Sequence, residues 1–252
     1  LDQKQIPNLK YIGKSFLHKS FDQNNDYSVP YFWGTLGIVY NDKFVKPGAI
    51  KTWNDLWSKK YRRQILLVDS ARDAMGMALV SLGYSMNTTS SIKLHLAQTK
   101  LNSLGPNIKA IISDEMKMYL VQNEAAIGVT WSGEAYEMME QNPHLHYVVP
   151  KQGSNLWFDN FVIPKTVQNK KAALKFINFM LEPKNAAQNA EYVGYATPNT
   201  AAQKLLPKKV RDDRQFYPTQ STLKNLQVFR DLGPKKTQEY NDLFLEFKMY
   251  AR

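Results

Sequence analysis

Residues 27–40 read YSVPYFWGTLGIVY, a run in which aromatic and β-branched residues predominate. Residues of these kinds are enriched in strands because they pack well on a pleated surface. We therefore predict a strand from Tyr31 to Tyr40. Four shorter runs of similar composition, each bounded by turn-forming or polar residues, predict further strands at Ile65 to Val68, Ala125 to Trp131, Leu145 to Val149 and Phe161 to Ile163.

Helical patterns lie between and after these strands. In Lys170 to Leu181, apolar residues recur at helical spacing and Pro183 follows. The other predicted helices are Asp73 to Leu82, closed by Gly83, then Ser91 to Leu104 and Gln238 to Met249. The alternation of strands and helices favours an α/β architecture with largely parallel sheets. No repeat or flexible linker divides the chain, so two lobes would have to be joined by strands that cross between them.

The composition is that of a globular chain with an excess of positive charge. Its 252 residues carry a formal net charge of +11. The lysines and arginines are scattered in short pairs and form no long basic run, so nucleic-acid binding stays only as an alternative. No cysteine is present, which excludes disulfides, thiolate metal sites and cysteine nucleophiles. The first residues show no signal-peptide pattern, and no apolar run is long enough to span a bilayer.

Acidic and aromatic residues occur together near the ends of predicted strands, where ligand crevices open in α/β sheets. Trp157 and Asp159 precede one strand, Trp131 ends another, and residues 69–73 join a strand to a helix. A tryptophan face attracts cations, and a carboxylate gives a charged amine a hydrogen-bonded partner. The pattern therefore suits an amine ligand. The alternatives are that the tryptophans are core residues and that Asp69 is a helix cap or turn residue.

Signals for catalysis or metal binding are weak. Residues 128–133, GVTWSG, do not match the Gly-x-Ser-x-Gly nucleophile elbow, and no glycine-rich phosphate loop is present. His144 and His146 would lie on one side of a strand and could begin a metal site, but no third ligand is evident. Tyr192 and Tyr195 are not the adjacent pair that would suit ferric iron. We therefore predict a binding protein with no enzymatic activity, cofactor or metal.

Five separated blocks resemble one known family, the bacterial spermidine/putrescine-binding proteins of ABC transporters. They follow the family's order and span nearly the whole chain: residues 27–35 (YSVPYFWGT), 52–57 (TWNDLW), 82–89 (LGYSMNTT), 157–159 (WFD) and 194–199 (GYATPN). The resemblance implies a two-lobed, type II periplasmic-binding-protein fold. Such a protein is expected to be a monomer that captures a polyamine and delivers it to an ABC transporter permease. It would act outside the cytoplasm, in the periplasm or anchored at the outer face of the cell membrane.

The resemblance also implies roles for individual residues. Trp157 would stack on the methylene chain of the ligand, and Asp159 would bind an ammonium end. Trp131 would form another wall, Tyr195 would lie near the ligand, and Asp73 stands where the family has a glutamate that contacts an amine.

Two candidate ligand-site positions depart from the family. Ser70 occupies the place of an aspartate and Phe229 that of a glutamine, which puts the preference among polyamines in question. The family's N-terminal segment has no counterpart in this sequence, so we expect an incomplete first lobe. That lobe would contain residues 1–35 and 158–203, and the second lobe residues 36–157 and 204–252. The same fold binding another solute, an anion or ferric iron, is the alternative.

Overall fold

The computed structural model describes residues 1–251, which divide into two compact units. Unit 1 contains residues 1–34 and 157–217, and unit 2 contains residues 35–156 and 218–251. The chain passes from one unit to the other within strand β1 (Ser28–Asn41), at the start of strand β6 (Leu156–Val162) and after Tyr217. No flexible tether is used at the first two passages, because each lies within or beside a regular strand.

Residues 204–217 group with unit 1, whereas the sequence analysis expected them in the second lobe. The backbone N–H of Thr197 donates to the Tyr217 hydroxyl at 3.2 Å, and the Tyr217 ring meets Trp33 edge-on at 6.0 Å. Helix α7 (Thr200–Leu205) also packs against α6 (Pro183–Val193). These contacts attach residues 204–217 to unit 1, and no local sequence pattern predicts them.

Unit 2 is built on a mixed sheet. Its strand order is β3-β2-β4-β1-β5, with β3 at Ile108–Ile112, β2 at Ile65–Val68, β4 at Ile127–Trp131 and β5 at Leu145–Val148. β2 runs parallel to β3 and β4, but β1 runs antiparallel to β4 and β5. The expectation of largely parallel strands therefore holds for β2 to β5, which share one direction, and is wrong for β1. β1 is inserted between β4 and β5 with the opposite direction, and alternating elements alone do not reveal such an insertion.

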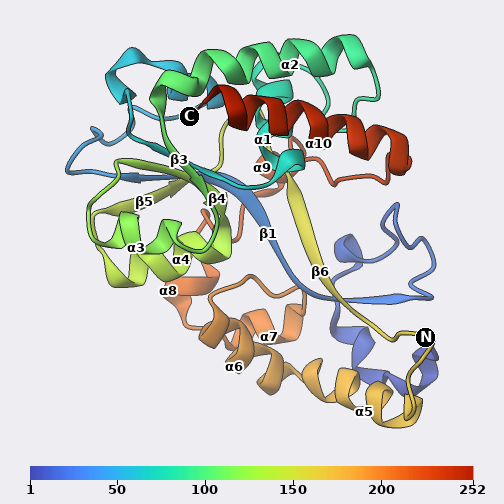
Figure 1. Cartoon of the computed structure of the whole chain (residues 1–252). Helices are drawn as coiled ribbons and strands as arrows, with labels where there is room; N and C mark the ends of the chain where they lie inside the picture. The colour runs from blue at the N-terminus through green and yellow to red at the C-terminus, as the bar shows by residue number, and fades with distance from the viewer. Residues whose placement is uncertain (252) are drawn as a thin grey trace. The chain divides into compact units, whose positions relative to one another are not determined.

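Helices cover both faces of this sheet, as Figure 1 shows. On one face α1 (Ala71–Ser81), α2 (Ser91–Leu104) and α10 (Gly233–Tyr250) pack against one another. On the other lie α3 (Met116–Val121) and α4 (Ser132–Gln141), and α4 also contacts β5. Because the sheet is covered on both sides, all of residues 35–41, the part of β1 that lies in unit 2, are buried. The continuous apolar character of that strand follows from this position.

The predicted helices of unit 2 agree closely with those observed. α2 has the predicted bounds, and Gly83 follows α1 with a φ of 78°, a left-handed conformation that glycine adopts without steric cost. α10 begins five residues earlier than predicted, with proline in its first turn, and buries Leu243, Phe244 and Phe247 as expected. The short segment α9 (Gln220–Leu223) precedes it. β3 was not predicted, because Lys109 interrupts its short apolar run.

Unit 1 contains the first half of β1, most of β6 and a layer of helices. Short 3-10 segments at Gln3–Gln5, Pro7–Tyr11 and Lys14–Phe16 precede β1, and α5 (Lys170–Met180), α6, α7 and α8 (Lys208–Arg211) follow β6. Their core contains Ile6, Ile12, Val29, Leu174, Ile177 and Leu181. Phe176 lies on the predicted apolar stripe of α5 but is 56% exposed, and Leu174 is buried instead.

No helix within residues 1–251 has both the length and the apolar character needed to cross a membrane.

Candidate functional site

In unit 1, β6 carries Trp157 and Asp159. Successive side chains on a strand point to opposite faces, so these two residues share a face and Phe158 lies on the other. Phe158 accordingly packs against the rings of Phe16 and Phe21, with centroids 6.2 and 6.3 Å away. The strand therefore presents a tryptophan and a carboxylate together; it begins at Leu156, five residues before the predicted strand, and so includes both residues.

Tyr195 completes an aromatic pair with Trp157. Their ring centroids are 5.4 Å apart at 64°, an edge-to-face arrangement that is favourable for aromatic rings. Gly194 ends α6 in a left-handed conformation with a φ of 77°, which turns the chain at the residue before Tyr195. The indole Nε1 of Trp157 is buried and has no hydrogen-bond partner within the part of the chain that the structure describes. The pair thus contains an unused donor.

The Asp159 side chain forms no ion pair or hydrogen bond with any of residues 1–251. It is exposed, yet nearby protein atoms displace enough water to raise its pKa above the ordinary value of 3.8. The pKa of Tyr31 is raised as well, first by burial and then by the negative charge of Asp159. Asp159 is therefore a carboxylate whose charge no cation of the described chain neutralises.

In unit 2, Ser70 and Asp73 form the N-terminal cap of α1. The Ser70 hydroxyl accepts the backbone N–H of Asp73 at 3.4 Å and donates to a carboxylate oxygen of Asp73 at 2.8 Å. Both residues thus have a structural role in capping. Asp69, for which we left capping open, is not the cap; it pairs with Lys248 at 2.7 Å.

Asp73 is only 4% exposed. Burial raises its pKa, and this effect exceeds the opposing hydrogen bonds from Ser70, Asn155 and Trp131 and the charge of Arg72. Asn155 donates to the second carboxylate oxygen of Asp73 at 3.4 Å, and its own side-chain oxygen is buried with no partner among residues 1–251. Unit 2 therefore brings Ser70, Asp73 and Trp131 together, and Asn155 adds an unused acceptor beside them.

Sequence reasoning missed Asn155 and the surroundings of Arg72. The guanidinium carbon of Arg72 lies 4.4 Å from the ring centroid of Phe229 and 5.0 Å from that of Tyr240. Arg72 also donates to the Asn87 side-chain oxygen at 3.1 Å. The phenylalanine at position 229, one of the two departures from the family pattern, therefore holds an arginine by a cation–π contact.

The two histidines considered for metal binding are engaged by one carboxylate. His144 Nδ1 and His146 Nε2 each lie 2.8 Å from a different oxygen of Asp42. No group of three or more potential ligands suited to a metal ion occurs within residues 1–251. Tyr192 is 90% exposed, whereas Tyr195 packs against Trp157.

Comparison with known proteins gives consistent results. The family model described as bacterial extracellular solute-binding protein matches residues 1–218. The spermidine/putrescine-binding periplasmic protein of Escherichia coli (strain K12) is 40% identical over 233 residues, which cover 92% of this chain and 67% of that protein.

Two solved structures are similar over nearly the whole chain. The spermidine/putrescine ABC transporter substrate-binding protein of Streptococcus pneumoniae has 54% identity and a TM-score of 0.93, with 100% of this chain and 78% of that chain covered. A lipoprotein of Treponema pallidum has 26% identity and a TM-score of 0.87, with 99% and 77% covered. The chain belongs to the family of bacterial extracellular solute-binding proteins and, within it, to the spermidine/putrescine-binding proteins.

Proposed function

We propose that this protein captures spermidine or putrescine outside the cytoplasm for uptake by an ABC transporter, and that it does so by binding alone. The observation that carries the proposal is the unpaired carboxylate of Asp159, which lies on the same face of β6 as Trp157; the Trp157 ring in turn packs against Tyr195. The names of the relatives support the same ligand class.

The residues of unit 1 have the chemistry that one end of a polyamine requires. An ammonium group beside Asp159 would neutralise its charge and make a charge-assisted hydrogen bond. The faces of Trp157 and Tyr195 would pack on methylene groups and attract the cation. The raised pKa of Asp159 supports this role, because a carboxylate that burial destabilises gains more from a bound cation than a fully solvated one.

The residues of unit 2 also have the chemistry to contact an amine. Asp73 is buried, its pKa is raised, and the unused oxygen of Asn155 lies next to it. An ammonium group can donate to both acceptors. Trp131 would supply an aromatic wall, and Ser70, already bonded to Asp73, would contribute its hydroxyl in place of the family's aspartate. Because a neutral hydroxyl replaces a charge, we expect this second contact to be weaker than that at Asp159.

The net charge of +11 does not prevent cation binding. At physiological salt the Debye length is about 8 Å, so distant lysines and arginines are largely screened. Local carboxylates therefore dominate the potential felt by a bound amine.

We further propose that units 1 and 2 are the two lobes of the solute-binding fold and that the loaded protein, as a monomer, delivers its ligand to the membrane permease. This proposal rests on family membership and on the passage of the chain through β1 and β6.

Calorimetric titration tests the ligand assignment. Spermidine and putrescine should each bind with one-to-one stoichiometry, whereas 1,4-butanediol, which has hydroxyls in place of the amines of putrescine, should not bind. Citrate and ferric citrate test the alternatives of an anion or ferric iron. Saturable binding of either, with no heat from the polyamines, would contradict the proposed function.

A further inference from the structure

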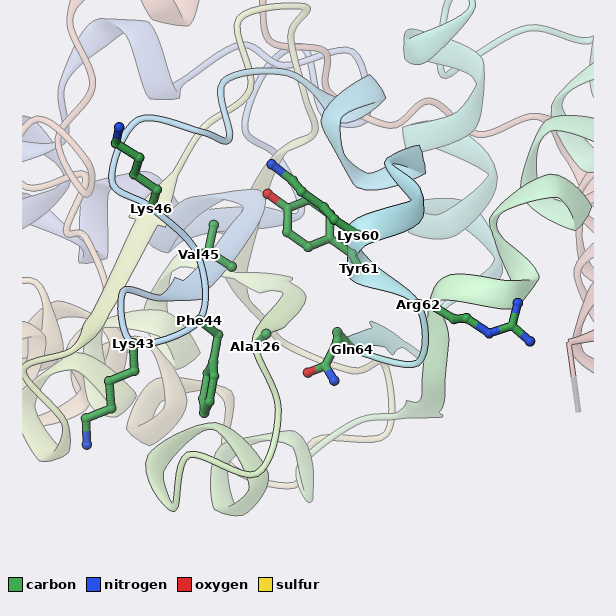
Figure 2. A pocket seen from close by; sticks show the side chains of 9 residues that line it. All are labelled: Lys43, Phe44, Val45, Lys46, Lys60, Tyr61, Arg62, Gln64 and Ala126. Atoms are coloured by element: carbon green, nitrogen blue, oxygen red, sulfur yellow. The ribbon is translucent and has the colours of Figure 1, made fainter.

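A pocket lies within unit 2, on residues that the polyamine proposal does not use. It has a volume of about 620 Å³ and is enclosed by the loop after β1 and the segment of residues 60–64 (Figure 2). Four cationic side chains contribute to its lining: Lys43, Lys46, Lys60 and Arg62.

These cations form no ion pair among the described residues. All four residues are exposed, and none of their side chains forms an ion pair with any carboxylate of residues 1–251. Asp42, next to Lys43 in the chain, is held by two histidines. Asp55 accepts the backbone N–H groups of Lys51 and Thr52 at 2.8 Å. Asp42 is therefore engaged elsewhere. Asp55 is bonded mainly to these backbone groups, and the charge of Lys60 is the smallest of the effects that lower its pKa.

Tyr61 provides an independent indication of a ligand. The residue is only 4% exposed, yet its hydroxyl has no hydrogen-bond partner within the described part of the chain. Leaving a buried polar group unsatisfied is unfavourable. In Figure 2 the ring extends from the 60–64 segment toward the loop that carries Lys43 to Lys46. Lys60 Nζ lies 4.7 Å from the ring centroid, so a cation and an unused hydroxyl occur together.

We propose that this pocket binds a phosphate-type oxyanion. Phosphate carries several acceptor oxygens and negative charge, which match the ammonium group of Lys60 and the donor hydroxyl of Tyr61 beside it, in the positive field of the neighbouring lysines (Figure 2). The ligand has the opposite charge to a polyamine, so the pocket is a separate site with a separate specificity.

The phosphate group can belong to free inorganic phosphate or to the headgroup of an anionic phospholipid. Phe44, which also lines the pocket, is 55% exposed. An exposed aromatic ring among lysines is also suited to a membrane interface, where basic residues attract anionic lipids. Both sources present the same phosphate oxygens, and the two arms of the experiment below distinguish them.

The first arm is an NMR titration of the protein with inorganic phosphate at constant ionic strength, set by chloride. The backbone amides of Lys43, Phe44 and Gln64 should shift saturably. The second arm is co-sedimentation with vesicles of phosphatidylglycerol, with phosphatidylcholine vesicles for comparison. Binding in either arm identifies the source.

The variant Lys43→Gln/Lys60→Gln should weaken this binding about tenfold or more, because the charge-assisted hydrogen bond from Lys60 and the nearby positive charge of Lys43 are lost. Lys171→Gln/Lys175→Gln removes the same net charge from two exposed positions of α5 and is the matched control. Tyr61→Phe keeps the ring, removes only the hydroxyl and should weaken binding severalfold. Because the substituted lysines are exposed, melting temperature and polyamine affinity should not change in either double variant.

Saturable shifts with phosphate that the pocket variant loses support the site with free phosphate as its source. If the protein binds only to phosphatidylglycerol vesicles, and the pocket variant loses this binding, the result supports the site with a lipid headgroup as the source of the phosphate. The proposal is overturned if neither probe binds saturably, or if the α5 control variant loses as much binding as the pocket variant.

Discussion

Replacement of Asp159 by asparagine tests the ligand contact for which the structure provides the clearest expectation. The amide has nearly the same size and stays on the same face of β6. Asp159 is exposed and makes no hydrogen bond within residues 1–251, so the substitution removes no contact of the free protein. We expect the free energy of unfolding to change by less than about 0.5 kcal/mol. Any effect on binding then reports the lost charge.

The expected loss of affinity follows from the type of bond that is removed. A hydrogen bond to a charged group contributes about 1.5–3 kcal/mol. Asp159 is partly hydrated in the free protein, and asparagine keeps one acceptor oxygen, so we expect the lower end of that range. A loss of about 1.5 kcal/mol corresponds to a polyamine dissociation constant raised by about tenfold.

The pH dependence provides a second readout. Only the ionised carboxylate pairs with an ammonium group, so the affinity of the parent should fall as the pH decreases through the pKa of Asp159. Because burial raises that pKa above 3.8, the fall should begin at a higher pH than for an ordinary aspartate. The Asp159→Asn variant should lack this step.

Calorimetry with spermidine and putrescine measures both effects. Glu191→Gln is the control, because it removes one negative charge from an exposed position of α6 in the same unit. Its affinity should remain within about twofold of the parent, since distant surface charges are screened. Unchanged affinity in Asp159→Asn, or an equal loss in Glu191→Gln, would refute the role assigned to Asp159.

Three further predictions concern the stability of the fold. The folded-state pKa of Asp73 is raised above 3.8, so the free energy of unfolding of the parent should fall as the pH rises from 3.8 through that pKa. Urea unfolding should therefore show the Asp73→Asn variant becoming more stable relative to the parent over this pH window. A decrease in its relative stability would contradict the argument. The pKa of Asp22 is shifted in the opposite direction. Burial raises it, but hydrogen bonds from the Ser28 hydroxyl and three backbone N–H groups lower it overall. Asp22→Asn should therefore reduce the free energy of unfolding by about 2 kcal/mol at neutral pH. This loss of stability should become smaller as the pH falls below 3.8 through the folded-state pKa of Asp22. A loss that does not change with pH would show that the negative charge of Asp22 is not its cause. In Gly37→Ala the new Cβ would lie 2.5 Å from the Tyr147 hydroxyl, so thermal unfolding should show a loss of about 1–3 kcal/mol. Gly105→Ala, whose Cβ would meet nothing closer than 3.7 Å, is its control, and equal losses would exclude the steric cause.

Much of the secondary structure could be predicted from local patterns. β2 and α2 have the predicted bounds, and β1 exceeds its prediction by a few residues. These elements carry strong signals, because aromatic and β-branched residues or helical periodicity extend over their whole length. β3, α3, α4 and α6 to α9 were not predicted. α6, for example, is rich in alanine and asparagine and has no large apolar stripe, and β3 has only five residues.

For the candidate site, the sequence determined which residues lie close together in the chain, and the observed bounds of β6 and α1 place these neighbours on one element. Trp157 and Asp159 are two apart on a strand, so alternation places them on one face, and Ser70 and Asp73 are three apart at the start of a helix. The five separated blocks were also sufficient to identify the family, because their order extends over nearly the whole chain.

Tertiary structure alone decided which distant residues meet. Asn155 bonds to Asp73 across 82 positions, Tyr195 packs on Trp157, and β1 enters its sheet antiparallel to β4. Propensity and periodicity describe neighbours in the chain, and they contain no information about which separate segments will share a buried volume. That choice depends on the packing of the whole unit, where each contact must offset the conformational entropy of the residues it orders. Burial in the folded unit also raises the pKa values of Asp73 and Asp159.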